Sequence, residues 1–325
     1  MHILNRQQIL AAFDAETITP LLKQGFIAYS QQRVQQPPVQ HFLFERADGD
    51  CCIKSAWLEG DELFVVKIST GFYRNAEHGL PSNQGLMMAF SAQTGEPQAL
   101  LQDEGWLTAL RTALAGRIVA ELCAPAHIQA IGIVGTGLQA RLQLQCLKPV
   151  TDCREVWVWG RDEQALAAYR RDAEAEGFRV RVTQNAAELA AHCQLIVTTT
   201  PSREPILQAA DIRPGTHITA VGADTPGKQE LATELVARAD ALLVDALAQC
   251  ADYGEIATAY RQKRLISTPI VEIGAVLAQG GRVRREPQHI TIADLTGLAI
   301  QDLQIAKGVL AIQDLQIAKG VLAKV

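Results

Sequence analysis

The stretch from Ile128 to Ala140 constrains this chain more than any other. It reads Ile-Gln-Ala-Ile-Gly-Ile-Val-Gly-Thr-Gly-Leu-Gln-Ala, an apolar run that ends in small residues, and helical character follows from Leu138 to Leu147. In a strand, turn and helix of this kind, Gly135 permits the tight turn, Gly137 lets the backbone approach a pyrophosphate, and Ala140 lets the helix pack close to the strand. The order therefore predicts a dinucleotide-binding turn. The alternative is a glycine turn that serves packing only.

Strands and helices alternate from this turn onward. Short apolar runs that favour strands are separated by stretches of helical spacing, and repeated units of this length require a parallel, doubly wound sheet. We predict strands at 156–159, 180–182, 195–199, 217–221, 241–244 and 289–293, with helices at 164–175, 186–193 and 229–239. Asn185 and Glu188 have the spacing of a capping box at the start of one of these helices.

Residues 1–115 have a different pattern. Apolar residues at helical spacing predict helices between Gln7 and Ser30, broken near Pro20. After a proline pair, short runs bounded by turn residues predict a mostly antiparallel sheet with strands at 41–45, 51–57, 63–69, 85–91 and 98–102. A helix at 106–123 leads into the nucleotide strand. We therefore predict an α/β chain in which a Rossmann-type doubly wound parallel sheet, residues 116–297, is joined to a smaller α+β domain, residues 1–115.

The end of the chain contains a 12-residue repeat. The segment from Ala299 to Leu310 recurs identically from Ala311 to Leu322, and its composition predicts a helix. Twelve residues turn a helix by a net angle of about 120°, so the second copy cannot present the same face to the same partner surface. A stacked repeat needs at least three units. We interpret the second copy as a recent duplication or a cloning artefact.

Composition narrows the classes of function. The chain has 325 residues, of which 48% are hydrophobic and 20% charged, as in an ordinary globular enzyme. A net charge of -5 leaves no basic stripe for nucleic acid. The N-terminal residues do not have the pattern of a secretory signal, and no apolar run approaches the ~18 residues of a membrane span. Seven cysteines without CxxC spacing indicate reduced thiols and no metal site. We expect a cytoplasmic protein with a small-molecule partner.

The residues that end the second nucleotide strand bear on the choice of cofactor. An acidic residue there would bind the adenosine ribose of NAD(H), but the strand ends Val156-Trp-Val-Trp-Gly160-Arg161-Asp162. Glycine removes a repulsive carboxylate and Arg161 offers a guanidinium suited to a 2′-phosphate, so we favour NADP(H) over NAD(H). The alternative is a solvated Arg161 at a helix start, with Asp162 as the cap. The cofactor contacts assigned so far are Thr112, Gly135, Thr136, Gly137, Leu138, Gln139, Ala140, Gly160, Arg161, Thr199, Val221 and Lys228.

Three charged residues are candidates for chemistry. Asp224 follows a parallel strand, where doubly wound folds place ligands, although its Asp-Thr-Pro-Gly context is as often only a turn. Lys67 interrupts an apolar strand, either as a catalytic lysine or as an edge-strand lysine that deters aggregation. Arg111 could bind a phosphate or a substrate carboxylate, and the alternative is an ordinary surface arginine.

Together these motifs resemble one family, the ornithine cyclodeaminase and mu-crystallin family, which includes ketimine reductases and the archaeal type of alanine dehydrogenase. The resemblance covers nearly the whole chain. Its most specific pieces are Val66-Lys-Ile68, Gly79-Leu-Pro-Ser82, Leu110-Arg-Thr-Ala113, Gly135-Thr-Gly-Leu-Gln-Ala140, Gly222-Ala-Asp-Thr-Pro-Gly-Lys-Gln-Glu-Leu231 and Asp294-Leu-Thr-Gly-Leu-Ala-Ile-Gln-Asp302.

The resemblance implies roles for individual residues. Lys67 and Asp224 would flank the substrate as the catalytic pair, and Arg111 would contact the substrate carboxylate or a cofactor phosphate. Ser82 would lie near the nicotinamide. It also implies a first domain completed by the C-terminal helix, residues 298–325, that pairs with the same domain of a second subunit in a homodimer. Further substrate contacts are assigned to Thr296 and Gly297.

The chain departs from the family pattern in one place. Family members usually carry an arginine on the strand after the proline pair, where it binds the substrate carboxylate, and this chain has Gln40 and His41 there. Lys54 lies where the ornithine enzyme has acidic or apolar lining. A cation there would bind the carboxylate and repel a protonated terminal amine. We therefore assign Gln40, His41 and Lys54 to substrate binding.

These expectations favour an NAD(P)H-dependent reductase of a small cyclic imine acid. The substrate would be Δ1-pyrroline-2-carboxylate or Δ1-piperideine-2-carboxylate, and the product proline or pipecolate. Ornithine cyclodeaminase is the first alternative, since it ends in the same half-reaction after bound NAD has oxidised ornithine and ammonia has left. A non-catalytic NADP(H)-binding crystallin is the second. The presence of both Lys67 and Asp224 argues against it.

Overall fold

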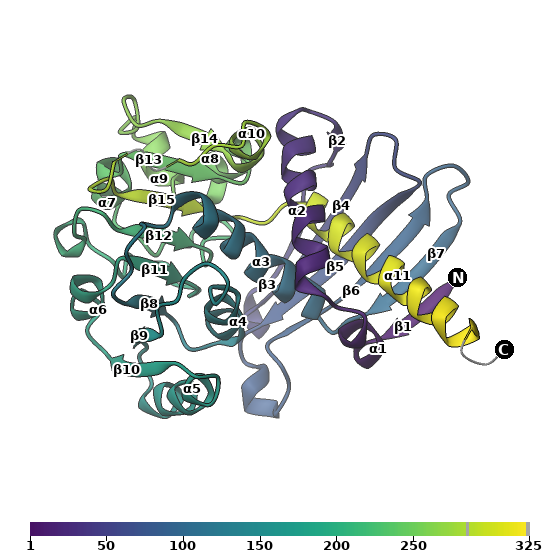
Figure 1. Cartoon of the computed structure of the whole chain (residues 1–325), viewed down its shortest axis with the longest axis horizontal. Helices are drawn as coiled ribbons and strands as arrows, with labels where there is room; N and C mark the ends of the chain where they lie inside the picture. Colours follow the sequence, from purple (N-terminus) through teal and green to yellow (C-terminus); the bar gives the residue numbers. More distant parts are fainter. Residues whose placement is uncertain (284–285, 323–325) are drawn as a thin grey trace. The chain divides into compact units, whose positions relative to one another are not determined.

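The computed structural model describes residues 1–283 and 286–322 (Figure 1). The chain forms two compact units, one made of Met1–Arg111 with Leu298–Val325 and the other of Thr112–Gly297. The first boundary falls within helix α3 (Trp106–Cys123). Within the described part of the chain, no helix combines the length and the apolar character that crossing a membrane requires.

The second unit is built on an eight-stranded parallel sheet, which confirms the predicted doubly wound fold. Its strands run in the order β10-β9-β8-β11-β12-β15-β13-β14. Five neighbouring strands of this sheet, β8, β11, β12, β15 and β13, consist entirely of buried residues, as expected for a sheet covered on both faces. The strands are β8 (Ile131–Val134), β9 (Glu155–Trp159), β10 (Arg179–Thr183), β11 (Leu195–Thr198), β12 (His217–Ala220), β13 (Ala241–Val244), β14 (Ile270–Glu272) and β15 (Thr291–Asp294).

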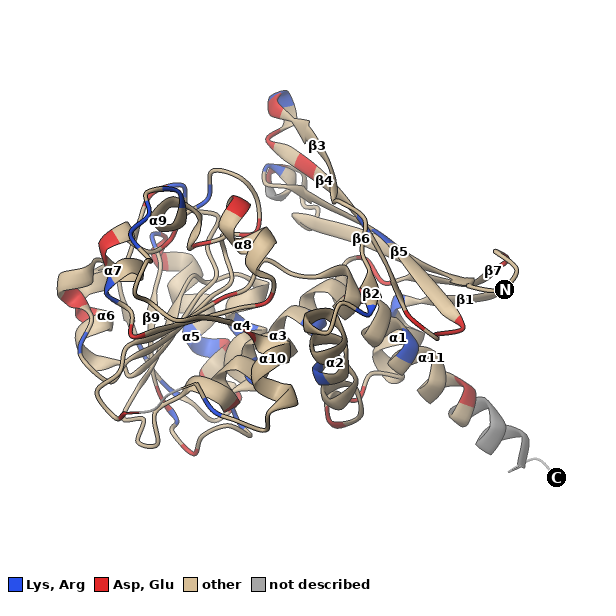
Figure 2. Ribbon diagram, turned by 90° about the horizontal axis from the view of Figure 1, so that it is seen from above, with Lys and Arg blue, Asp and Glu red and all other residues tan. Residues whose placement is uncertain are grey.

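Helices lie on both sides of this sheet (Figure 2). The sequence predicted α4, α5 and α6 at nearly their observed bounds, and α7 is shorter than predicted. The sequence analysis did not predict helices α8, α9 and α10 or strand β14. The helices are α4 (Leu138–Cys146), α5 (Glu163–Ala175), α6 (Ala186–His192), α7 (Thr233–Arg238), α8 (Leu247–Tyr253), α9 (Ala257–Arg261) and α10 (Ile273–Ala278).

The first unit contains a seven-stranded, mostly antiparallel sheet, as predicted. Its order is β1-β7-β6-β5-β4-β2, with β3 also paired to β4. Strand β1 pairs parallel to β7, and the sequence predicted neither β1 nor the two-residue β2. The strands are β1 (His2–Asn5), β2 (Val34–Gln35), β3 (Gln40–Phe44), β4 (Gly49–Leu58), β5 (Leu63–Phe72), β6 (Asn83–Ser91) and β7 (Pro97–Gln102).

In the described part of this unit, the helices that pack on the sheet cover one of its faces. Helices α2 (Ala15–Ser30) and α11 (Ala299–Leu322) pack on each other, and α11 packs on β4, β5 and β6 (Figure 1). The covered face consists of cross-strand rows of buried side chains, such as Ala56, Val65 and Ala89. The opposite face is half-exposed and carries another apolar row, Trp57, Phe64 and Phe90. One apolar face of this sheet is thus left without a helix of its own unit.

Two local predictions were wrong. The break between α1 (Arg6–Ala11) and α2 falls at Asp14, whose side chain caps α2 through the N–H of Thr17, and Pro20 lies inside α2. Proline removes one hydrogen bond of the helix, and the buried face of α2 outweighs that loss. Asn185 does cap α6, but Glu188 accepts from the hydroxyl of Thr183 at 2.6 Å rather than from Asn185, so the reciprocal capping box is not formed.

The two copies of the C-terminal repeat form one continuous helix, α11, with different environments. In the first copy Ile300 and Leu303 are fully buried. In the second, Ile312 is half-buried and Leu315, the equivalent of Leu303, is 60% exposed. The rotation predicted for a 12-residue shift therefore holds for the part of the second copy whose side chains the structure describes, up to residue 315.

Candidate functional site

The glycine turn lies where the strand order of the parallel sheet reverses. Strands β9 and β10 extend the sheet from β8 in one direction, and β11 and β12 extend it in the other. Doubly wound folds bind ligands beyond the carboxyl ends of the strands at such a reversal. Gly135 follows β8 and Thr199 follows β11, and the Thr199 backbone N–H and hydroxyl donate to the carbonyl of Val134 at 2.9 and 3.1 Å. These bonds fix the two strand ends side by side.

The two glycines of the turn differ in their surroundings. Gly135 has a φ of 120°, and a Cβ there would lie 2.6 Å from the hydroxyl oxygen of Thr199. Gly137 caps the nine-residue α4, and a Cβ there would meet nothing within 4 Å. Open space over bare backbone at the start of a helix is what a pyrophosphate needs. These residues fit the predicted dinucleotide, whose phosphates they would hold at the N-terminus of α4.

Arg141, which the sequence analysis missed, holds the turn in shape. Its guanidinium donates to the carbonyl oxygens of Thr136 and Gly137 and forms an ion pair of 2.9 Å with Asp172 on α5. The guanidinium also lies over the ring of Tyr169, 4.9 Å from its centroid. An arginine directly after Ala140 was the available signal. Because its donors point at the backbone of the turn, its role is to fix the carbonyls.

Thr136 of the dinucleotide turn leaves little room for a side chain at Gly160. A Cβ at this position would lie 2.8 Å from Cγ2 of Thr136, so a side chain there would displace the dinucleotide turn. Arg161 is exposed, and its carbonyl accepts from the side chain of Gln184 at 3.0 Å. Asp162 caps α5 through the N–H of Ala165 at 2.6 Å, as one alternative predicted. The cofactor role of Arg161 stays a prediction.

Asp224 and Lys228, predicted for catalysis and cofactor binding, lie together on the loop after β12. Their Oδ1 and Nζ atoms are 2.6 Å apart, and the side chains are 51% and 12% exposed. The loop turns at Gly227, whose φ is 85°. The same strand edge also carries Val221, whose N–H donates to the carbonyl of Thr198 at 2.9 Å. The loop thus presents a half-exposed carboxylate beside an ammonium group.

Thr112, another residue assigned to the cofactor, lies on α3. Its carbonyl accepts from the side-chain amide of Gln143 on α4 at 3.1 Å. This bond ties α3 to the helix that follows the glycine turn. Within α4, Leu138 is 38% exposed and Ala140 is fully buried, so the first turn of the helix has one open side and one packed side.

A buried glutamate, Glu230, ties together the loops that follow β11 and β12. Its carboxylate accepts from the hydroxyl of Thr198 at 2.6 Å, from the N–H of Thr200 at 2.6 Å and from the N–H of Gly222 at 2.9 Å. Burial raises the pKa of Glu230 to about 7 against the lowering effect of these bonds. Glu230 belongs to a motif quoted for the family, but the sequence analysis assigned it no role.

Asp245 holds the loop that carries Thr296 and Gly297. It accepts from the Thr296 hydroxyl at 2.8 Å and from the Gly297 N–H at 2.6 Å. Gln249 donates to the Thr296 hydroxyl at 2.9 Å and to the Gly297 carbonyl at 3.1 Å. Both residues assigned to substrate binding are therefore anchored by protein groups, and that assignment stays a prediction.

The first unit contains a buried cluster of charges on the covered face of its sheet. Lys54 on β4 lies opposite Lys67 on β5 in the antiparallel register. Asp302 on α11 places Oδ2 at 2.9 Å from Nζ of Lys67 and Oδ1 at 3.1 Å from Nε of Arg111 on α3. The four residues are between 1% and 8% exposed. Three cations thus lie around Asp302, and two of them, Lys67 and Arg111, are paired with it, a concentration of positive charge suited to an anionic ligand.

Two alternatives from the sequence are excluded by this arrangement. Strand β5 is paired on both sides, by β4 and β6, so Lys67 is not an edge-strand lysine. Arg111 is 6% exposed and paired with Asp302, so it is not a surface arginine. The structure thereby brings together Lys54, Lys67 and Arg111, and adds Asp302, which the sequence analysis did not assign.

The charges of this cluster affect one another strongly. Burial lowers the pKa of Lys67 to about 8, with repulsion from Arg111 and Lys54 acting in the same direction and attraction from Asp302 opposing them. Burial alone would raise the pKa of Asp302, but Lys67 and Arg111 outweigh it and hold that pKa below its ordinary value. Asp302 is therefore ionised near neutral pH, and the charge of Lys67 depends on it.

The three other predicted residues of this unit differ in placement. His41 on β3 lies opposite Cys52, on the same side of β4 as Lys54, and its Nδ1 is 3.2 Å from the Cys52 sulfur. Gln40 lies opposite Ile53, on the other side of the sheet. Ser82 precedes β6, and its carbonyl accepts from the N–H of Phe72 at 2.7 Å. His41 thus shares a face with the charge cluster and Gln40 does not.

Comparison with known proteins gives consistent relationships. A model of the ornithine cyclodeaminase/mu-crystallin family matches residues 2–314. The chain is 36% identical to the alanine dehydrogenase of Archaeoglobus fulgidus over 94% of this chain and 93% of that protein. It is 32% identical to the iminosuccinate reductase of Paracoccus denitrificans over 95% and 96%. It is 28% identical to a Δ1-pyrroline-2-carboxylate reductase of Bacillus cereus over 86% of each chain.

Solved structures agree with these relationships. An archaeal alanine dehydrogenase dimer with bound NAD has a TM-score of 0.88 and 33% identity, covering 98% of this chain and 97% of that one. The iminosuccinate reductase of Paracoccus denitrificans in complex with NAD+ has a TM-score of 0.87 and 28% identity, covering 97% of each chain. The predicted fold class and family resemblance are therefore confirmed.

Proposed function

Because the chain belongs to the ornithine cyclodeaminase/mu-crystallin family, we propose that it is an NAD(P)H-dependent reductase of a small cyclic imine acid. The substrate is Δ1-pyrroline-2-carboxylate or its six-membered homologue, and the product is proline or pipecolate. The observation that carries this proposal is the burial of three cations, Lys54, Lys67 and Arg111, within one cluster around Asp302. The family in general consists of nicotinamide-dependent enzymes of amino and imino acids.

The buried cations of this cluster suit an imine acid better than a diamino acid. The carboxylate of an imine acid needs cations, and Lys54, Lys67 and Arg111 supply them. Ornithine brings a second, distal ammonium group that requires a carboxylate or carbonyl partner, and burying it unpaired would cost several kcal/mol. Lys54 adds a like charge that would repel it. This argues against the cyclodeaminase alternative.

The residues also divide the tasks of the reaction. When bound, the nicotinamide cofactor supplies hydride to the imine carbon. The first turn of α4, with Gly135 and Gly137, would hold its phosphates. Asp224, half-exposed and beside Lys228, would hold or relay the proton that the imine nitrogen gains. Lys67 would bind and orient the carboxylate.

A second candidate function is supported by similarity. Identity to the alanine dehydrogenase of Archaeoglobus fulgidus is 36%, against 28% for the pyrroline carboxylate reductase of Bacillus cereus. The alternative substrate is therefore an acyclic 2-imino acid formed from a 2-oxo acid and ammonia. It presents the same carboxylate and the same C=N bond, so the charge cluster serves it equally well.

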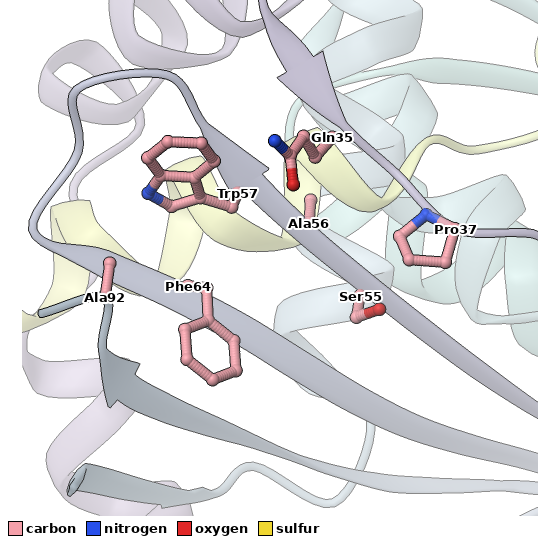
Figure 3. Close-up of a pocket in the computed structure, with 7 residues that line it drawn as sticks. All are labelled: Gln35, Pro37, Ser55, Ala56, Trp57, Phe64 and Ala92. Atoms are coloured by element: carbon pink, nitrogen blue, oxygen red, sulfur yellow. The ribbon is translucent and has the colours of Figure 1, made fainter. Parts of the chain in front are cut away.

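We further propose that NADP(H) is preferred and that two copies of the chain pair. Arg161 supports the first, because it follows the strand where a carboxylate would enforce NAD(H). The helix-free face of the first unit's sheet supports the second. A pocket of about 340 Å³ lies there, lined in part by Trp57 and Phe64 (Figure 3). The ring of Phe64 stacks on that of Phe90, with centroids 5.0 Å apart. Exposed aromatic rows are typical anchors of interfaces. The free thiols fit a cytoplasmic enzyme.

The decisive experiment measures oxidation of NADPH and NADH with each candidate substrate. We expect turnover with Δ1-pyrroline-2-carboxylate or its six-membered homologue above that with pyruvate plus ammonia. We expect no ammonia from ornithine with added NAD(P)+. The reverse ranking of imine acids would support the second candidate. Stoichiometric ammonia and proline from ornithine would make the protein a cyclodeaminase and overturn the proposal.

A charge reversal tests the carrying observation directly. Lys54→Glu should raise KM for the imine acid at least tenfold with a smaller change in kcat, because it removes a uniform binding contact. Lys263→Glu is the matched control, since Lys263 is exposed in the other unit. An unchanged KM in Lys54→Glu would remove Lys54 from the substrate site.

A further inference from the structure

Asp302 contacts two of the three cations in the charge cluster, Lys67 and Arg111. One of its oxygens faces the ammonium of Lys67 at 2.9 Å, and the other faces Nε of Arg111 at 3.1 Å. Each of the three residues is on a different element, β5, α3 or α11. A second tie comes from Gln301, whose side-chain oxygen accepts from Arg111 at 3.5 Å and from the N–H of Leu298 at 2.7 Å.

The residues around Lys67 explain why the carboxylate of Asp302 matters for the charge of Lys67. Lys54 on β4 and Arg111 on α3 both repel the ammonium group, while Met87 on β6 lies opposite it in register and contributes no charge. Asp103, which precedes α3, is buried and also attracts Lys67 through its charge, and its Oδ2 accepts from the N–H of Leu107 at 2.7 Å. Asp302 is therefore the carboxylate in direct ion-pair contact with Lys67 in the described part of this unit.

We infer that Asp302 is the positioning residue of the substrate site: it fixes Lys67 and Arg111 relative to each other and keeps Lys67 in its charged, carboxylate-binding form. This inference rests on the proposed function. Asp302 acts through Lys67 and need not touch the substrate itself. Without its charge, Lys67 would lose its ion-pair partner while the repulsion from Arg111 and Lys54 remained, and Lys67 would relieve that repulsion by losing its proton.

The C-terminal repeat supplies a matched control. Asp314 has the same neighbours as Asp302 in sequence, Ile-Gln before it and Leu-Gln-Ile-Ala-Lys-Gly after it, but is exposed. Asp302→Asn and Asp314→Asn therefore make the same chemical change in the same local sequence. A general effect of the substitution on the helix would appear in both variants, and an effect of the ion pair would appear in Asp302→Asn alone.

The test compares kcat/KM against pH for the wild type and both variants. In Asp302→Asn the alkaline limb should move at least one pH unit lower, so that kcat/KM at pH 8.5 falls about tenfold, mainly through KM. Near pH 6, where Lys67 is protonated in either protein, removing an anion strengthens attraction for the substrate carboxylate, so KM should be equal or lower. The two profiles should therefore cross. Asp314→Asn should follow the wild type throughout.

A uniform loss of kcat/KM at every pH in Asp302→Asn would show a structural role and overturn the inference, as would a profile identical to that of the wild type. Calorimetric binding of L-proline across the same pH range separates this inference from the proposed function. If no imine acid is reduced, yet proline binding in Asp302→Asn shows the same shift to lower pH, the proposed reaction fails and the role of Asp302 stands. If reduction proceeds and neither measurement shifts, the role of Asp302 fails alone.

Discussion

Gly160 at the end of β9 lies so close to Thr136 of the dinucleotide turn that a Cβ on Gly160 would sit 2.8 Å from the threonine methyl group. A side chain at the position where many nucleotide-binding folds carry an acidic residue would therefore require Thr136 to shift in this protein. The choice of cofactor must depend on the residues that follow, and the strand end cannot be changed without disturbing the turn.

This packing predicts that Gly160→Asp will not convert the enzyme to NADH. The new side chain must push Thr136 aside, so KM should rise at least tenfold for both NADPH and NADH and the melting temperature should fall. Steady-state kinetics and a thermal melt measure both effects. Gly281→Asp serves as the control, since Gly281 is exposed and a Cβ there would meet nothing within 4 Å. A clean switch to NADH would show that the turn yields without cost.

Arg161 is predicted to set the cofactor preference. In Arg161→Ala the ratio of kcat/KM for NADPH to that for NADH should fall about tenfold or more, because charge-assisted hydrogen bonds to a 2′-phosphate are worth about 1.5 to 3 kcal/mol each. The value of kcat with NADH should hardly change. A ratio that moves less than threefold would leave Arg161 as the solvated residue at a helix start that the alternative describes.

The two copies of the repeat are predicted to differ in their contribution to stability. Leu303→Ala removes a fully buried side chain and should cost about 2 to 5 kcal/mol of unfolding free energy. Leu315→Ala removes the equivalent leucine, which is 60% exposed, and should change it by less than about 0.5 kcal/mol. Denaturant unfolding of both variants measures the contrast. Equal losses would show that the second copy packs as tightly as the first.

The buried carboxylates of the second unit predict lower stability at higher pH. Burial raises the pKa of Glu230 and of Asp294 to about 7, from ordinary values of 4.5 and 3.8. Between the ordinary and raised values the folded protein binds more protons than the unfolded chain. The free energy of unfolding should therefore fall as pH rises toward and through 7, by at most about 1.4 kcal/mol per pH unit for each group.

Glu255 offers a way to test the carboxylate effect. Burial, with repulsion from Glu230 and Asp294 in addition, raises its pKa well above the ordinary value. Glu255→Gln keeps an oxygen for the N–H of Glu230, now accepted at 3.0 Å, and removes a titrating group. Its melting temperature should fall less between pH 6 and 8.5 than that of the wild type. Glu234→Gln, at an exposed glutamate, should follow the wild type. Parallel pH curves for all three proteins would contradict the prediction.

The sequence predicted the parts of this protein that have a local signature. The parallel sheet, the glycine turn and the antiparallel sheet follow from periodicity and turn residues, and the structure confirms them. Lys67 was found because a lysine inside an apolar strand is conspicuous. Whether it lay at an edge or at the centre of the sheet could not be determined, because strand order depends on pairings between distant segments.

Asp302 shows why the sequence could not predict the remaining residues of the candidate site. Its neighbours in sequence are those of Asp314, yet one aspartate pairs with Lys67 and Arg111 and the other is exposed. No property of the local sequence can separate two identical segments, since the difference lies in which one reaches the sheet. Glu230 was missed for a related reason. Its hydrogen-bond partners are backbone groups of loops brought together by the sheet.

The duplicated segment of α11 also has a consequence for chains that lack one copy. Deleting residues 299–310 or residues 311–322 leaves the same polypeptide, because the two segments are identical. A chain with a single copy therefore has no altered residue at the junction, whichever copy is removed. Loss of either copy leaves an aspartate at position 302, so a chain with one copy keeps the sequence that forms the charge cluster.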